Sequence, residues 1–129
     1  MTHYLSVAQI EALHAIQIER YGGASGIRDR GGMEAAAARP AMTFGGDDLY
    51  PDIPSKAAAL LHSLVMNPPF RDGNKRVGAH ALLAFLGAND MAPLFGAREL
   101  EETVMAVARG EMDIEPLTIW LRQRIARRD

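Results

Sequence analysis

Two apolar segments of helical length, separated by one short polar stretch, constrain the fold of this chain more than any other feature. Residues 53–66 carry apolar side chains on most faces, and Pro54 stands where a first helical turn accepts proline. Residues 76–86 have the same apolar character and end near Gly87. Because a helix that is apolar on most sides is stable only when buried, the sequence predicts that these two helices form the centre of a domain.

Four further segments have helical spacing of apolar residues and recognisable end signals. The first of them begins with a Ser6–Gln9 capping box and stops at Gly22. The predicted helices cover residues 7–21, 30–39, 54–66, 77–86, 98–109 and 114–126. No segment shows the apolar–polar alternation of a half-buried strand for more than a few residues. We therefore expect an all-α fold: a single compact domain of about six helices over residues 1–129.

Composition narrows the class of protein. A chain of 129 residues with 48% hydrophobic residues suits one core and one domain. The formal net charge of −2 gives no electrostatic footprint for nucleic acid or for an anionic membrane. Absence of cysteine excludes disulfides and thiolate chemistry. No signal peptide or membrane-spanning run is apparent, so a cytoplasmic protein is expected, with neither nucleic acid nor membrane as partner.

The polar stretch between the two apolar segments predicts an anion site. Gly73 and Asn74 lie where a helix begins, and the first turn of a helix has backbone N–H groups without partners. Those donors favour a phosphate, and Lys75 and Arg76 add positive charge beside it. Asp72 is a hard oxygen ligand for a magnesium ion that bridges phosphates. The alternative is an ordinary turn with a capped helix and two solvated basic residues.

The stretch from Phe70 to Arg76, Phe-Arg-Asp-Gly-Asn-Lys-Arg, resembles the signature loop of the Fic/Doc family. That pattern runs His-x-Phe-x-(Asp/Glu)-(Gly/Ala)-Asn-(Gly/Lys)-Arg. Lysine at position 75 makes the loop similar to the Doc (death on curing) toxin branch. Similarity to that branch extends outward to Tyr21-Gly22-Gly23, Gly26-Ile27-Arg28-Asp29 and Met33-Glu34-Ala35-Ala36, so the resemblance covers nearly the whole chain.

The resemblance implies a toxin of a toxin–antitoxin system that transfers phosphate from ATP to a hydroxyl of a translation factor, elongation factor Tu in the best-matched case, and so inhibits translation. Asp72 would hold Mg²⁺, Gly73 and Asn74 would donate to the nucleotide, and Lys75 and Arg76 would neutralise phosphate charge. The broader Fic activity, transfer of AMP to a protein hydroxyl, is the alternative. Lys75 in place of glycine argues against it.

The family also implies protein partners. Residues 43–52 have turn chemistry without a sustained period, and the corresponding family segment is a flap beside the active site that aligns the target chain. Phe44, Leu49 and Tyr50 are then candidate target contacts; alternatively, they pack the loop onto the core. The Ser/Thr-x-x-x-Glu-Gly/Asn motif of self-inhibiting members is missing. Inhibition is therefore expected from a separate antitoxin whose C-terminal segment covers the cleft.

One position departs from the family pattern. The family pattern has a histidine two residues before Phe70, and the resemblance implies that this histidine is the general base. In this chain Pro68 stands at that position. Proline has no titratable group, and losing a positioned base typically costs about 10²- to 10⁴-fold in rate. Two explanations stay open: an intact toxin inactivated at this position, or a catalytically dead protein that keeps nucleotide or partner affinity. We favour the first, because residues 72–76 all match the family.

Other titratable residues are interpreted as structural. His14 and His62 lie within predicted helices and are expected to be partly buried, not catalytic. His80 is one turn beyond Arg76 and is kept as a candidate second contact to the cleft. Glu34 is expected at the surface or the edge of the core.

Overall fold

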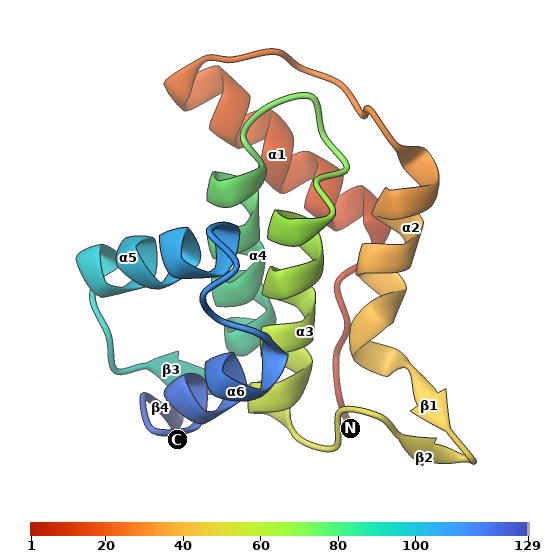
Figure 1. The fold of residues 1–129 in the computed structure, drawn as a ribbon, viewed down its shortest axis with the longest axis vertical. Coiled ribbons are helices and arrows are strands. Elements are labelled where there is room, and N and C mark those ends of the chain that lie inside the picture. The colour runs from red at the N-terminus through yellow and green to blue at the C-terminus, as the bar shows by residue number, and fades with distance from the viewer. Residues whose placement is uncertain (129) are drawn as a thin grey trace.

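The computed structural model describes residues 1–128, and most of them are helical (Figure 1). The helices are α1 (Val7–Tyr21), α2 (Arg30–Ala38), α3 (Ile53–Met66), α4 (Asn74–Ala88), α5 (Ala97–Ala108) and α6 (Ile114–Arg122), with a 3₁₀ turn at Arg39–Ala41. Two short two-stranded antiparallel sheets complete the fold: the hairpin of β1 (Thr43–Phe44) with β2 (Asp47–Asp48), and β3 (Met91–Pro93) with β4 (Ile125–Arg127). The predicted all-α domain of six helices is confirmed.

The last helix is shorter than predicted. It ends at Arg122, and residues 125–127 leave it to pair with β3 instead of continuing to Ala126. Two main-chain hydrogen bonds extend this pairing: Leu94 N donates to Arg124 O at 2.7 Å, and Arg128 N donates to Asp90 O at 2.7 Å. The apolar spacing at the end of the chain resembled a helix because Ile125 packs against the core from a strand just as it would from a helix.

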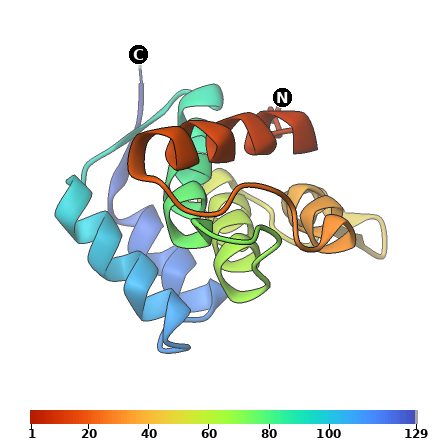
Figure 2. The same ribbon diagram turned by 90° about the horizontal axis from the view of Figure 1, so that it is seen from above.

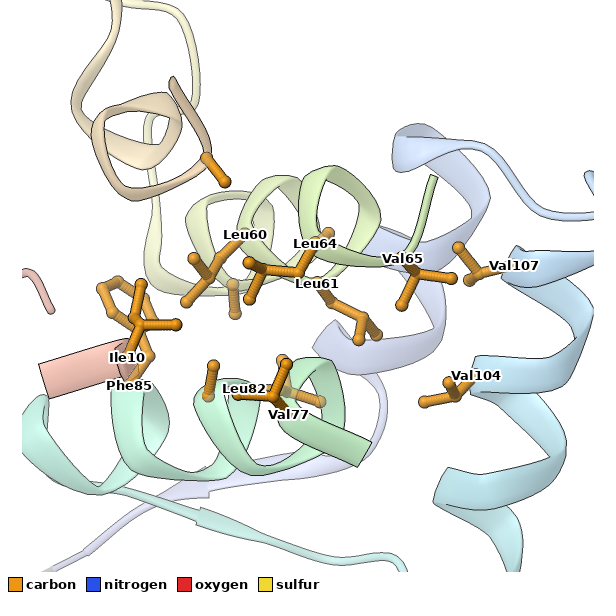
Figure 3. Packing of buried hydrophobic residues seen from close by; sticks show 14 of the residues in the cluster. Ile10, Leu60, Leu61, Leu64, Val65, Val77, Leu82, Phe85, Val104 and Val107 are labelled. Carbon is orange, nitrogen blue, oxygen red and sulfur yellow. The ribbon is translucent and has the colours of Figure 1, made fainter. Parts of the chain in front are cut away.

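Helices α3 and α4 form the centre of the molecule. Leu60, Leu61, Leu64 and Val65 of α3 lie opposite Val77, Leu82 and Phe85 of α4, while Ile10 of α1 and Val104 and Val107 of α5 close the sides (Figure 3). The two helices approach closely at Gly78, where an added Cβ would lie 3.0 Å from Val65 Cγ2. The stretch that joins these two buried helices is therefore held at both ends by the core.

The other elements surround this pair. α2 and the hairpin β1–β2 lie on one side, α5 and α6 on the other, and α1 lies across α4 (Figures 1 and 2). Asp52 caps α3 by accepting from Ser55 N at 3.1 Å, and its other oxygen accepts from Arg122 Nη2 at 2.8 Å. Burial acts to raise the pKa of Asp52, but the hydrogen bonds from Ser55 and Arg122 outweigh it and hold that pKa below its usual value. None of the helices within residues 1–128 is long and apolar enough to cross a membrane.

A buried lysine fixes hairpin β1–β2 to the first turn of α3. Lys56 is 2% exposed, and its Nζ lies 3.1 Å from Asp48 Oδ2 and 3.2 Å from Pro40 O. Burial acts to lower the pKa of Lys56, but its contacts with Tyr4 and Asp48 outweigh burial and raise it, so the lysine is charged. Tyr50 is also buried, and its hydroxyl accepts from Arg39 Nε at 2.8 Å.

One side chain, Asn89, ties the N-terminal segment to the end of α4. Its Oδ1 accepts from His3 N at 2.7 Å, and its Nδ2 donates to His3 O and Phe85 O, both at 2.8 Å. We expect Asn89→Ala to lower the free energy of unfolding by about 1–2 kcal/mol, because three hydrogen bonds are lost together. Urea unfolding monitored by circular dichroism measures this. Glu101→Ala, an exposed change on α5, should stay within about 0.5 kcal/mol; equal effects of the two substitutions would contradict the prediction.

Candidate functional site at the α3–α4 loop

The candidate site is built on the loop of residues 67–73, called here the motif loop, between α3 and α4. α3 ends at Met66, and Pro68 and Pro69 follow, which cannot donate the next helical hydrogen bonds. α4 begins after Gly73, whose φ of +74° lies in the left-handed region that favours glycine. No side chain caps this helix. Within residues 1–128, the backbone amides of positions 74–76 have no protein acceptor, as an anion site requires.

The side chain of Asn74 is used inside the loop. Its Oδ1 accepts from Phe70 N, and its Nδ2 donates to Phe70 O, both at 3.0 Å. The backbone amide of Asn74 and the second N–H of its Nδ2 have no acceptor within the described residues, so the predicted side-chain donor stays a prediction. The amide of Gly73 is also engaged, because it donates to Asp72 Oδ1 at 2.9 Å. The available donors thus begin one residue later than the sequence suggested.

Asp72 is an exposed carboxylate held by backbone. Its Oδ2 accepts from Ala24 N at 3.3 Å, and the chain comes so close at Gly23 that an added Cβ would lie 2.7 Å from this oxygen. Mg²⁺ typically takes one or two protein carboxylates and fills its remaining positions with phosphate oxygens and water. A single exposed carboxylate at Asp72 is compatible with that mode. No group of three or more His, Cys, Asp or Glu that could hold a metal occurs within residues 1–128.

Lys75 and Arg76 both lie exposed on the first turn of α4. The Arg76 guanidinium lies over the ring of Tyr21, 4.3 Å from the ring centroid, in cation–π geometry. Tyr21 is the last residue of α1, so α1 helps to fix the position of this cation. The start of α4 lies at one end of the α3–α4 pair (Figure 1), and Asp72, Lys75 and Arg76, which are close in sequence there, are all exposed.

The connection of residues 22–29 between α1 and α2, which was not predicted to contact the candidate site, lies along the motif loop. Arg28 N and Asp29 N donate to Pro69 O at 2.8 and 3.0 Å, and Arg71 N donates to Gly26 O at 3.2 Å. The Arg28 guanidinium also donates to Pro68 O. The glycines in this connection were the available signal, because close main-chain pairing of two loops favours residues without a side chain.

The structure does not bring the predicted flap residues to the motif loop. Phe44, Leu49 and Tyr50 lie in or beside hairpin β1–β2, which is fixed to the first turn of α3, whereas the motif loop follows its last turn. α3 has 14 residues, which corresponds to a separation of roughly 20 Å; Figure 1 shows the hairpin and the loop at opposite ends. Phe44 is 81% exposed, while Tyr50 is part of the core.

None of the histidines substitutes for the absent base at position 68. His14 is buried, and its Nε2 is bound to the main-chain O of Asp72 at 2.7 Å. His62 faces α6, with Nε2 3.9 Å from Asp113 Oδ1. His80 makes no hydrogen bond to the motif loop within the described residues. Pro68 itself is half-buried, and its only polar atom is the main-chain oxygen. The contacts of His14 with Asp72 O and of His62 with Asp113 are those expected of structural histidines.

The surroundings of His62 predict that the free energy of unfolding depends on pH through this residue. Burial lowers the pKa of His62 from its usual 6.5. The charge of Asp113 acts to raise this pKa and that of Arg39 to lower it, and the net effect is a lowered pKa. The folded protein therefore binds a proton less readily than the unfolded chain. The stability from neutral His62 is complete above pH 6.5 and is lost as the pH falls through the lowered value. We expect the loss of stability between pH 7 and pH 5 to be smaller in His62→Gln than in the wild type; identical pH dependence in urea unfolding would refute this.

Comparison with known proteins agrees with this geometry. The sequence model of the Fic/DOC family matches residues 4–86, more than half of the chain. The chain belongs to the Fic/DOC family. It is similar to the protein named Toxin Doc from Mycolicibacterium smegmatis, 37% identical over 119 residues that cover 91% of this chain and 89% of that protein. It is also similar to the protein named Protein kinase doc from Escherichia phage P1, 29% identical over 120 residues that cover 93% and 94% of the two chains.

Proposed function

We propose that this chain is a Doc-type toxin of a toxin–antitoxin pair, built to transfer phosphate from ATP to a hydroxyl of a translation factor, with elongation factor Tu expected from the resemblance. We further propose that Pro68 leaves it without its general base. The observation that carries the proposal is the start of α4, where the backbone amides of residues 74–76 have no protein acceptor within residues 1–128 and Asp72, Lys75 and Arg76 are all exposed. The names of the two relatives, a toxin and a protein kinase, support it.

The proposed reaction uses these groups as follows. The target hydroxyl oxygen forms a bond to the γ-phosphorus of ATP, the bond from that phosphorus to the β–γ bridging oxygen breaks, and ADP leaves. Amides of residues 74–76 and the side chains of Lys75 and Arg76 stabilise the charge on the phosphate oxygens. Mg²⁺ held by Asp72 would supply further charge neutralisation there. The hydroxyl proton has to reach a base, and position 68 offers none.

Two alternatives differ from the proposed function in what is transferred to the target. One is transfer of AMP, and the other is a binding protein that transfers nothing. Fic-type AMP transfer would place the α-phosphate on the target, and the length of Lys75 beside the phosphates disfavours it. A catalytically dead binding protein would hold nucleotide or an antitoxin and transfer nothing, even with a base restored at position 68. Labelling the target with the Pro68→His variant, separately from γ- and α-labelled ATP, therefore distinguishes all three.

The direct test of the site is binding of Mg·ATP, measured by isothermal titration calorimetry. We expect the wild-type chain to bind, and we expect Lys75→Ala and Arg76→Ala each to weaken binding by on the order of tenfold, as loss of a charge-assisted contact does. Arg98→Ala is the matched control, because Arg98 is equally basic and exposed but lies on α5. Absence of Mg·ATP binding by the wild type would reject the proposal.

The partner proposals concern two surfaces. The antitoxin is proposed to cover the motif loop with its C-terminal segment. Hairpin β1–β2 is proposed as a separate contact for the target protein, through the exposed side chains of Phe44 and Leu49. Tyr50 would contribute only by holding the hairpin, since its ring is buried and its hydroxyl is bound to Arg39.

A further inference from the structure

His14 is a buried histidine outside the motif that contacts the motif loop directly. It comes from the middle of α1, is 4% exposed, and stacks on the ring of Phe70 with centroids 3.8 Å apart and planes 6° apart. Its Nε2 lies 2.7 Å from the main-chain oxygen of Asp72, 58 positions further along the chain. The imidazole therefore has two separate contacts, one through its face and one through its edge.

The edge contact determines where the ring carries its proton. A carbonyl oxygen only accepts hydrogen bonds, so Nε2 is protonated and donates to Asp72 O. The acceptor belongs to the peptide group that joins Asp72 to Gly73. Gly73 is the left-handed residue from which α4 starts, and an added Cβ on it would lie 3.7 Å from Nε2 of His14. The ring thus lies against the very turn that directs the start of α4.

We propose that His14 is a positioning residue of the anion site. By holding the Asp72–Gly73 peptide, it sets the direction in which α4 starts and the direction in which the free amides after Gly73 point. The same peptide carries the Asp72 side chain, which His14 thereby keeps beside Ala24 N. The identity of the ligand, a magnesium-bound nucleoside triphosphate, rests on the proposed function. The control of the Asp72–Gly73 peptide by His14 is independent of that function.

The competing explanation is that His14 only fills space under Phe70. The two explanations differ in what they require of position 14. Packing requires a flat ring, which phenylalanine supplies without a donor. Positioning requires an N–H donor near the place of Nε2, which glutamine supplies without a ring. His14→Phe and His14→Gln therefore separate the face contact from the edge contact.

The first measurement is made on the nucleotide-free protein by NMR. Loss of the hydrogen bond to Asp72 O should change the ¹³C shift of that carbonyl and the ¹⁵N shift of Gly73. We expect both signals to move in His14→Phe and to stay near their wild-type positions in His14→Gln. If His14→Phe folds and leaves both signals unchanged, the inference is overturned. Should that variant fail to fold, the ring ¹⁵N spectrum of wild-type His14 decides: protonated Nε2 supports the inference, and protonated Nδ1 overturns it.

The second measurement is Mg·ATP affinity of the folded variants, by the same calorimetry. We expect His14→Phe to bind on the order of tenfold more weakly, the effect of one lost hydrogen bond, and His14→Gln to stay within about threefold of wild type. Equal affinities of wild type and His14→Phe would overturn the inference. A wild type that binds no Mg·ATP rejects the proposed function instead, and the carbonyl signal of Asp72 still decides the role of His14.

Discussion

Pro68→His is expected to raise transfer of the γ-phosphate to the target protein by about 10²- to 10⁴-fold, the usual contribution of a positioned general base. The substitution should not disturb the loop, because Arg28 holds the main-chain oxygen of residue 68, which any side chain leaves in place. Two readouts measure the effect: growth of bacteria that express the variant without an antitoxin, and labelling of elongation factor Tu from γ-labelled ATP. Arrested growth together with labelling is the expected result.

Pro68→Ala is the matched control for this experiment. It removes the proline ring but adds no base, so it should remain inactive. Asp72→Asn in the Pro68→His background should again abolish labelling, since Asp72 is the proposed metal ligand. Normal growth and an unlabelled target with Pro68→His would favour the dead binding protein, and label from the α-phosphate would favour AMP transfer. Activity in Pro68→Ala would show that the base is not the missing element.

Lys56→Ala is expected to lower the free energy of unfolding by about 3 kcal/mol, because the change empties a buried site and leaves the Pro40 oxygen without its donor. The lysine is 2% exposed and joins α3 both to hairpin β1–β2 and to the chain before it. Urea unfolding measures the loss. The amide of Leu49, which donates to Met42 O at 2.9 Å across the hairpin, should also exchange faster with solvent.

Lys56→Met separates the charge of the lysine from its packing. Methionine fills similar volume, and Asp48 is half-exposed and can turn to water, so its unpaired charge costs little. We expect a loss of about 1–2 kcal/mol, from the hydrogen bond to Pro40 O and the cation–π contact with the Tyr4 ring. If the methionine variant is as unstable as the alanine variant, the ion pair with Asp48 contributes more than its exposure suggests, and the packing explanation fails.

The parts of this molecule that could be predicted from sequence are those governed by local chemistry. The Ser6 capping box, the prolines after α3 and the glycine before α4 placed helix ends that the structure confirms. The buried character of α3 and α4 followed from apolar residues on most faces. These signals depend on neighbours within a few positions, which a sequence displays directly.

The parts that could not be predicted depend on contacts between distant positions. The pairing of Arg28 with Pro69 and the contact of His14 with Asp72 leave no local trace beyond glycines and one histidine. The bonds of the Asn74 side chain to Phe70 could not be predicted either, although an amide with both a donor and an acceptor suits the closing of a loop. The family resemblance implied that hairpin β1–β2 lies beside the motif loop, whereas the structure places the two at opposite ends of α3 (Figure 1).

Under the proposed function, the separation of hairpin β1–β2 from the motif loop sets how long an artificial acceptor must be to contact both. An extended chain spans at most about 3.3–3.6 Å per residue, so a peptide needs roughly six residues to reach from one to the other. A tripeptide that carries the acceptor hydroxyl would contact the motif loop but would be too short to reach hairpin β1–β2. Paired assays of the Pro68→His variant with short and long peptides would then measure catalysis and recognition as two independent quantities.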